Sequence, residues 1–300
     1  MAFHIPSAEE RQAAIGDTGG LSKPMQRAFT PKSDFDPIPP PQPGDWLAAH
    51  PEPGQSFAEF VASHPNRPTE RRNTLYLQPL GEFPEDRSPS PDLLEAYGAA
   101  FFDMPVKRLP ILSINRMGLT TRVNPMTGNR QILTRDVLAL LKRRLPDDAF
   151  CILAFTMEDL YPDPSWNFVF GQASLRERVG VFSFARYDPA FYGENRGEDY
   201  RETLLRRSCK VLAHETAHMF HLAHCVYFHC LMNGSNHLKE SDARPLRLCP
   251  VCLRKLYDSI GFDMVERYRR LQGFYEKVGF SPEAAWIRNR AAFIQKGDGS

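Results

Sequence analysis

The chain has 300 residues, 42% of them hydrophobic, which is enough to bury the core of one large domain or two ordinary ones. Its 37 lysines and arginines balance 36 aspartates and glutamates, so a net charge of +1 gives no reason to expect binding to nucleic acid or to a membrane surface. Six cysteines are too few for a disulfide scaffold of this length, and four of them cluster between 225 and 252, which indicates metal binding.

The N-terminal part of the chain is poorly patterned. It begins MAFHIPSAEERQAAIG, without an apolar run after a basic start, and no stretch of transmembrane length follows, so we expect a cytoplasmic protein with no membrane partner. Residues 31–53 contain eight prolines, which favour an extended conformation over helix or sheet. We predict a proline-rich arm over residues 1–70, packed through Trp46, Leu47, Phe57 and Phe60 on a body formed by residues 71–300.

The body alternates strand-like and helical patterns, which is typical of an α/β fold. Strands are predicted over 73–80, 108–115 and 149–157, and helices over 91–102 and 134–145, the second with Thr134 as its N-cap. Residues 166–174 and 178–187, rich in aromatic and β-branched side chains, predict the two strands of a hairpin. From about residue 200 onward the pattern is mostly helical.

The stretch HETAHMFHLAHC, residues 214–225, carries the chemistry. On a helix, His214 and His218 lie on one face about 6 Å apart along the axis, so both imidazoles reach one zinc ion, while Glu215 can take a proton from the attacking water. His221 lies about 10 Å from His214 along a straight helix, too far for convergence on one ion. We therefore predict that the helix ends, the chain turns back, and His224 is the third ligand.

These residues resemble the archaemetzincins, a family of metzincin-clan zinc peptidases. The likeness covers HETAHMFHLAHC, a methionine soon after it, a later CPVC, and the stretches MNGSNHLKESDARPLRLCPVCLRKL (232–256), WNFVFGQASL (166–175), VFSFARY (181–187) and GFDMVERY (261–268), which are most similar to the archaemetzincin-2 branch. It runs from about residue 45 to about 270. The resemblance implies a compact α/β (α+β) metzincin-like catalytic domain over 71–300, with a mixed twisted sheet, an active-site helix and a helical C-terminal part.

Four cysteines form a C-x₄-C pair and a C-x₂-C pair, which together suit a closed tetrahedral site for a second, structural zinc: Cys225, Cys230, Cys249 and Cys252. Because Cys225 directly follows His224, we expect the two zinc ions to be mechanically coupled. The resemblance places the Met-turn methionine at Met232. Cys151 and Cys209 are expected to be buried thiols.

The resemblance further implies a peptidase, possibly an aminopeptidase, with Glu215 as general base and two zinc ions per chain. Its peptide substrate would lie extended along an edge strand, for which the hairpin around 178–187 is the candidate, with Arg186 and Tyr187 as candidate substrate contacts. The family has glycine at the position of His221, so we expect a left-handed backbone there at a cost of roughly 1–2 kcal/mol.

Other hypotheses remain at this stage. The histidine motif is short enough to arise by chance, and the four cysteines could be ordinary thiols. The segment LRLCPVCLRK could belong to a nucleic-acid-binding zinc ribbon, but it lacks interleaved aromatics and a wider basic surface, so no nucleic-acid partner is expected. Two other classes of protein are a catalytically silent zinc protein that binds peptides or partners in the same cleft, and an interaction module in which the histidines are structural.

Overall fold

The computed structural model describes residues 3–296, and the chain divides into two compact units. Unit 1 consists of Met1–Pro65, Ala100–Phe102 and His221–Ser300, and unit 2 consists of Asn66–Ala99 and Asp103–Phe220. The segment predicted as an arm thus folds into the same unit as the C-terminal helices, and its apolar side chains Phe29, Ile38 and Leu47 are buried. No described helix is long and apolar enough to cross a membrane.

Unit 2 is built on a five-stranded sheet in the order β2-β1-β5-β8-β7. All neighbours are parallel except β7 and β8, which form the predicted antiparallel hairpin. The strands are β1 (Thr74–Leu80), β2 (Val106–Arg108), β5 (Ala149–Thr156), β7 (Gly171–Ser174) and β8 (Val179–Ser183).

The strands predicted over 73–80 and 149–157 are confirmed, whereas the one over 108–115 is wrong. There the strand ends at Arg108, pairing resumes only as an isolated bridge at Leu112, and residues 114–116 form a 3₁₀ turn (η1, Ile114–Arg116). Pro110 lies in the gap, where its missing N–H interrupts the ladder.

A second sheet of unit 2 has the order β3-β4-β6, with β3 (Thr121–Val123), β4 (Arg130–Leu133) and β6 (Asp159–Tyr161). Helices α5 (Pro91–Phe102) and α6 (Thr134–Arg143) confirm the two predicted helices, and α7 (Tyr200–Met219) follows. Thr134 does not cap α6, because Leu133 takes the N-cap position and the Thr134 hydroxyl donates to Oε1 of Gln172 instead.

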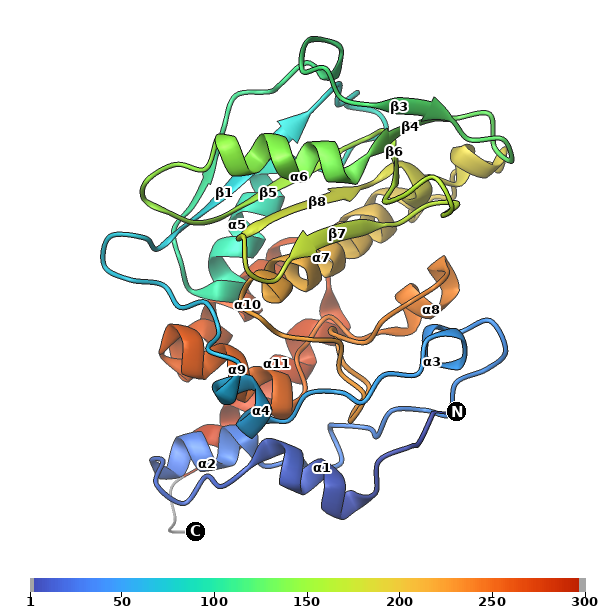
Figure 1. Cartoon of the computed structure of the whole chain (residues 1–300). Coiled ribbons are helices and arrows are strands. Elements are labelled where there is room, and N and C mark those ends of the chain that lie inside the picture. The colour runs from blue at the N-terminus through green and yellow to red at the C-terminus, as the bar shows by residue number, and fades with distance from the viewer. Residues whose placement is uncertain (1–2, 297–300) are drawn as a thin grey trace. The chain divides into compact units, whose positions relative to one another are not determined.

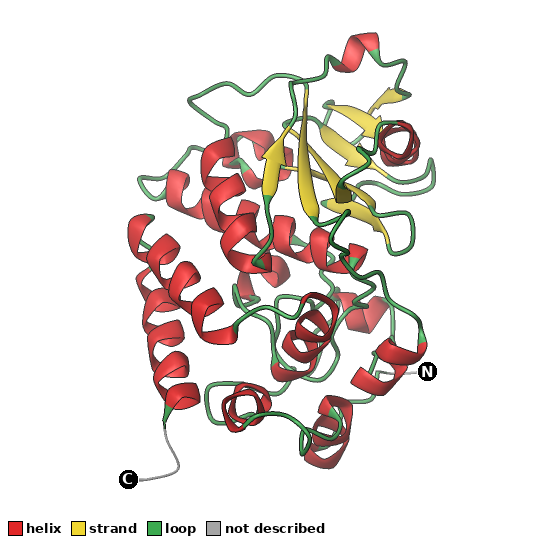
Figure 2. Ribbon diagram, turned by 90° about the vertical axis from the view of Figure 1, so that its left-hand side faces the viewer, coloured by secondary structure: helices red, strands yellow, loops and turns green. Residues whose placement is uncertain are grey.

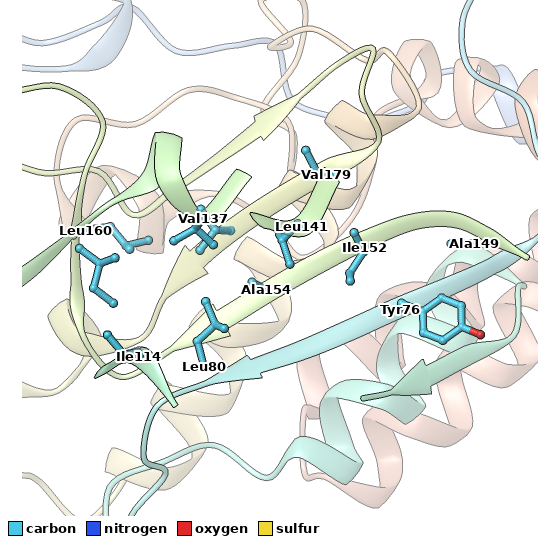
Figure 3. Packing of buried hydrophobic residues seen from close by; sticks show 12 residues of the cluster. Tyr76, Leu80, Ile114, Val137, Leu141, Ala149, Ile152, Ala154, Leu160 and Val179 are labelled. Atoms are coloured by element: carbon cyan, nitrogen blue, oxygen red, sulfur yellow. The ribbon is translucent and has the colours of Figure 1, made fainter. Parts of the chain in front are cut away.

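The larger sheet lies between helices, with α6 on one face and α7 on the other (Figures 1 and 2). Figure 3 shows the core on the α6 face, where Val137 and Leu141 of the helix pack over Ile152 and Val179 of the sheet. All four side chains are fully buried. This packing fixes the sheet against which α7, the helix that carries the candidate catalytic residues, lies.

Unit 1 is mostly helical, as predicted for the C-terminal part. Its helices are α1 (Ala8–Ile15), α2 (Lys23–Phe29), α3 (Trp46–Ala49), α4 (Phe57–Ala62), α8 (Leu238–Ala243), α9 (Pro250–Ile260), α10 (Met264–Lys277) and α11 (Ser281–Gln295). Helix α9 contacts α1, α2 and α4, while α10 packs along α11. The N-terminal segment and the cysteine-bearing helix α9 therefore share one core.

Candidate metal centres

Helix α7 of unit 2 brings two histidines of the predicted site together. His214 and His218 are one turn apart, and their Nε2 atoms face each other at 3.1 Å with the rings nearly perpendicular. Two nitrogens that bind one tetrahedral zinc ion at 2.0–2.1 Å lie about 3.3 Å apart. The pair therefore fits a shared metal ion.

Glu215 lies beside this pair and against the edge strand β7. Its side chain is only 6% exposed, and a Cβ added to Gly171 would lie 2.6 Å from Glu215 Oε1. Only a glycine lets the strand backbone pass this close to the carboxylate. Sequence reasoning missed this role for Gly171, although an isolated glycine in a strand pattern signals a close approach.

The segment after α7 turns back as predicted. The helix ends at Met219, and His221 has a φ of 73°, the left-handed conformation expected where the family has glycine. Within unit 1, Gln55 holds this turn, because its amide donates to the His221 carbonyl (3.2 Å) and its Oε1 accepts from the Ala223 N–H (3.1 Å). Lys255 donates to the same Oε1 at 3.1 Å.

Three residues later, His224 is oriented by the N-terminal segment of unit 1. Its Nδ1 lies 2.9 Å from Oε1 of Glu52, which also accepts from Trp46 Nε1 at 2.9 Å. The Trp46 ring packs edge-on against His224 and over Gly234, where an added Cβ would lie 2.3 Å from the ring. A carboxylate on Nδ1 fixes the imidazole so that Nε2 is the nitrogen available for a metal. No sequence signal pointed to Glu52.

The four clustered cysteines come together in unit 1. Their sulfur atoms all lie within 4.8 Å of one another, and the Sγ atoms of Cys225 and Cys249 are 3.6 Å apart. That distance excludes a disulfide, whose sulfurs are about 2.05 Å apart, and matches the separation of about 3.8 Å between two sulfurs that bind a tetrahedral zinc at 2.3 Å. Hydrogen bonds among the four buried thiols lower the pKa of Cys225 well below its usual range and raise the pKa of Cys249 and of Cys252 well above it. Four buried thiols can all ionise only beside a cation, so the geometry of the four sulfur atoms is what fits a zinc ion.

Comparison with known proteins agrees with this geometry. Residues 122–258 match the model of Peptidase family M54. Archaemetzincin-2 of Rattus norvegicus is 44% identical over 280 residues, an alignment that covers 84% of this chain and 78% of the rat protein. The chain belongs to the archaemetzincin family.

Other archaemetzincins are more distant. Human Archaemetzincin-1 is 34% identical over 261 residues, covering 78% of this chain and 52% of the human protein. The crystal structure of the archaemetzincin of Methanopyrus kandleri is 28% identical and covers 64% of this chain and 97% of its own, with a TM-score of 0.47. As an archaemetzincin, the chain is a zinc metallopeptidase that acts on peptides, and the sequence predictions of family and enzyme class are confirmed. The mixed sheets and helices confirm the predicted fold class.

The candidate substrate-binding hairpin of this archaemetzincin is formed by β7 and β8. Strand β8 is hydrogen-bonded on both sides, to β5 and β7, so the free edge of the hairpin belongs to β7. Arg186 is 5% exposed and holds Asp159 through two bonds of 2.9 and 2.8 Å, and Tyr187 is 2% exposed. Breaking a buried ion pair by removing one partner costs about 3–5 kcal/mol, so contact between Arg186 and a substrate would require a costly rearrangement.

Met232 of the archaemetzincin lies on the segment that carries the cysteines. It is fully buried, and its carbonyl accepts from the Cys225 N–H at 2.8 Å, which ties the two ends of the C-x₄-C loop together. Asn233, whose role the sequence pattern did not indicate, closes the same loop because its side-chain amide donates to the Cys225 carbonyl at 2.7 Å. Cys151 and Cys209 are buried as expected, and burial raises the pKa of Cys151.

A third group that could hold a metal, Asp45, His237 and Glu240, is explained by hydrogen bonds alone. His237 caps α8 by accepting from the Glu240 N–H, and its Nε2 lies 3.1 Å from Asp45. Each carboxylate also accepts a backbone N–H, from Gln42 to Asp45 and from Trp46 to Glu240. The group fastens α3 to α8 rather than indicating an ion.

Proposed function

We propose that this archaemetzincin hydrolyses peptide bonds at a zinc ion held by His214, His218 and His224, and that Cys225, Cys230, Cys249 and Cys252 hold a second, structural zinc. The observation that supports the catalytic site most strongly is the opposed pair of Nε2 atoms on α7, 3.1 Å apart, beside the carboxylate of Glu215. The left-handed turn at His221 and the Glu52 bond to His224 support the choice of the third ligand.

In this mechanism Glu215 is the general base and then the general acid. It takes a proton from the attacking water and passes it to the leaving amine, and its position one residue after His214 keeps it beside the metal ligands throughout. A bound zinc ion supplies a Lewis acid that lowers the pKa of water and polarises the scissile carbonyl. The free edge of β7 offers backbone groups with which an extended substrate can pair. Gly171 of this strand lies against the Glu215 carboxylate, so the paired substrate would lie close to the general base.

We also propose that the enzyme acts as an aminopeptidase, a hypothesis carried by the family resemblance. Purified protein should contain two zinc ions per chain and cleave members of a peptide library, lose cleavage on treatment with 1,10-phenanthroline, and regain it with added zinc. Peptides with a free amino terminus should be cleaved and their acetylated forms should not. Cleavage of both forms would make it an endopeptidase, and two zinc ions without any cleavage would favour the catalytically silent alternative.

Gly171→Ala should impair catalysis with little effect on folding. The added methyl group would overlap the end of the Glu215 side chain, which can move aside and so lose its catalytic position. We expect kcat/KM to fall about 10²-fold, since misplacing a catalytic group by 1 Å has that effect, while the melting temperature stays within a few degrees. Gly20→Ala is the matched control, because nothing lies within 4 Å of its added Cβ. Unchanged kcat/KM in Gly171→Ala would contradict the placement of Glu215.

Glu52→Ala should weaken zinc binding at the histidine site. Removing the carboxylate that orients His224 is expected to lower zinc affinity about 10–100-fold, and Glu52→Gln, which can still accept the two hydrogen bonds, should have a smaller effect. Cobalt substitution separates the two sites, because only the cysteine site gives thiolate charge-transfer absorption. An exposed control is Glu85→Ala. Equal affinities in all four proteins would exclude a role for Glu52.

A further inference from the structure

Unit 2 has a second place where the chain topology favours ligand binding, apart from the metal helix. From β1 the chain passes through α5 to β2 on one side of β1, whereas β5, reached through α6, pairs on the other side. The strand order therefore reverses between β1 and β5. In open α/β sheets, ligands bind in the crevice beyond the carboxyl ends of the strands at such a reversal.

A cavity of about 670 Å³ lies at this point. Its lining includes Gly81 and Glu82, which follow β1, and Met157 and Glu158, which follow β5. Gly81 has a φ of 84°, and an added Cβ would lie 2.6 Å from Ile114 Cδ1, so a glycine is needed for this turn in the cavity lining. The volume falls within the range of about 300–1,000 Å³ typical of small-molecule sites.

The cavity is distinct from the metal centre. Arg87, which lines it, accepts a hydrogen bond at its carbonyl from Tyr200, the first residue of α7 (3.0 Å). His214 lies about four turns further along the same helix, roughly 20 Å away. A ligand in this cavity would therefore not touch the histidines of α7.

The charged side chains of the cavity fall into two groups. Asp159 forms an ion pair with Arg186 at 2.8 Å, and Asp188 forms one with Arg196 at 2.7 Å.

The second group has few protein partners. In the described part of the chain, the carboxylates of Glu82 and Glu158 and the guanidinium of Arg87 have no hydrogen bond or ion pair. Arg130 uses one nitrogen to donate to Asn115. Glu158 is half-buried; desolvation raises its pKa, and the nearby charges of Arg130 and Arg87 lower it in part. Glu82, Arg87 and Arg130 are exposed, so the cavity brings two acids and two arginines together with few bonds to the rest of the protein.

We propose that this cavity binds a small zwitterion, an α-amino acid or a dipeptide, with its ammonium group on Glu158 and its carboxylate on Arg130. A simple anion would meet the unneutralised carboxylates, and a simple cation would meet the arginines, whereas a ligand with both charges satisfies both kinds of group. Ile111, 61% exposed, and Phe191 provide apolar surface at the same cavity for a side chain.

Isothermal titration calorimetry with single L-amino acids tests the proposal directly. The dipeptide alanyl-alanine can be titrated into the Glu215→Gln variant, which should not hydrolyse it. At least one zwitterion should bind, and its N-acetylated and amidated forms should bind at least about 10-fold more weakly. Glu158→Gln and Arg130→Gln should each weaken binding about 10-fold or more, with Glu194→Gln as the exposed control. Neither substitution removes a buried side-chain hydrogen bond. Arg130→Gln removes only the exposed hydrogen bond from Arg130 to Asn115.

Three results would overturn the proposal. The first is that no zwitterion binds. The second is that phosphate and acetate bind as tightly as the amino acids. The third is that binding survives both substitutions and disappears when zinc is removed, which would assign the binding to the metal centre. The proposal does not depend on catalysis at the histidines, because binding is measured at equilibrium and does not require turnover. A catalytically silent protein could still bind the zwitterion, so failure of one hypothesis leaves the other testable.

Discussion

The Glu215→Gln protein is expected to retain its zinc and to lose about 10²–10⁴-fold in kcat. Glutamine has nearly the same shape as glutamate, so it can occupy the space beside Gly171 without disturbing β7 or α7. It cannot accept a proton from water at neutral pH, so the step that depends on a general base is lost. The metal ligands are untouched, because the opposed nitrogens belong to His214 and His218.

This result should be measured as kcat and KM on a fluorogenic peptide, with the metal content of the same preparation. Glu202→Gln is the matched control on the same helix, since its exposed pair with Arg206 contributes at most about 1 kcal/mol to stability and lies far from the histidines. A Glu215→Gln protein that cleaves at the wild-type rate would exclude Glu215 as the base. Loss of both zinc and activity would indicate a structural defect instead.

The parts of the site that follow from local geometry could be predicted from the sequence. A helix places residues four apart on one face, so the spacing of His214 and His218 was sufficient to pair them. The left-handed backbone at His221 followed from the need to end the helix and turn, and the cysteine spacings were sufficient to group the four thiols.

The parts that depend on contacts distant in sequence could not be predicted. The amino-acid pattern of residues 178–187 shows a strand but not its neighbours, so it could not show that β7 is the outer strand of the hairpin and that β8 pairs on both sides. Glu52 approaches His224 across 172 residues, and Gly171 meets Glu215 across 44, so no local period reports either contact. The ion pair of Arg186 could not be predicted for the same reason, since Arg186 lies in a 3₁₀ turn after β8 and its partner Asp159 lies on β6.

Cys252→Ala is expected to remove the structural zinc and much of the stability of unit 1. Binding at structural zinc sites is worth about 10–16 kcal/mol in small domains, comparable with the whole stability of about 5–15 kcal/mol of an ordinary domain. The remaining three thiols would be left buried without the ion, on the loop between Cys225 and Cys230 and at the start of α9. We expect a fall of more than 10 °C in melting temperature and one zinc lost per chain.

Cys151→Ala is the control that isolates the metal. It deletes the same atoms from an equally buried position in β5, so it carries only the packing cost of about 1–2 kcal/mol. Since Cys225 directly follows His224 and its N–H is bonded to Met232, loosening the cysteine loop should also release the His224 ligand. The cobalt spectrum of the histidine site in Cys252→Ala should therefore weaken together with the cysteine bands. If the histidine site keeps its full zinc affinity after the cysteine zinc is lost, the two ions bind independently. The adjacency of His224 and Cys225 would then not couple the two sites.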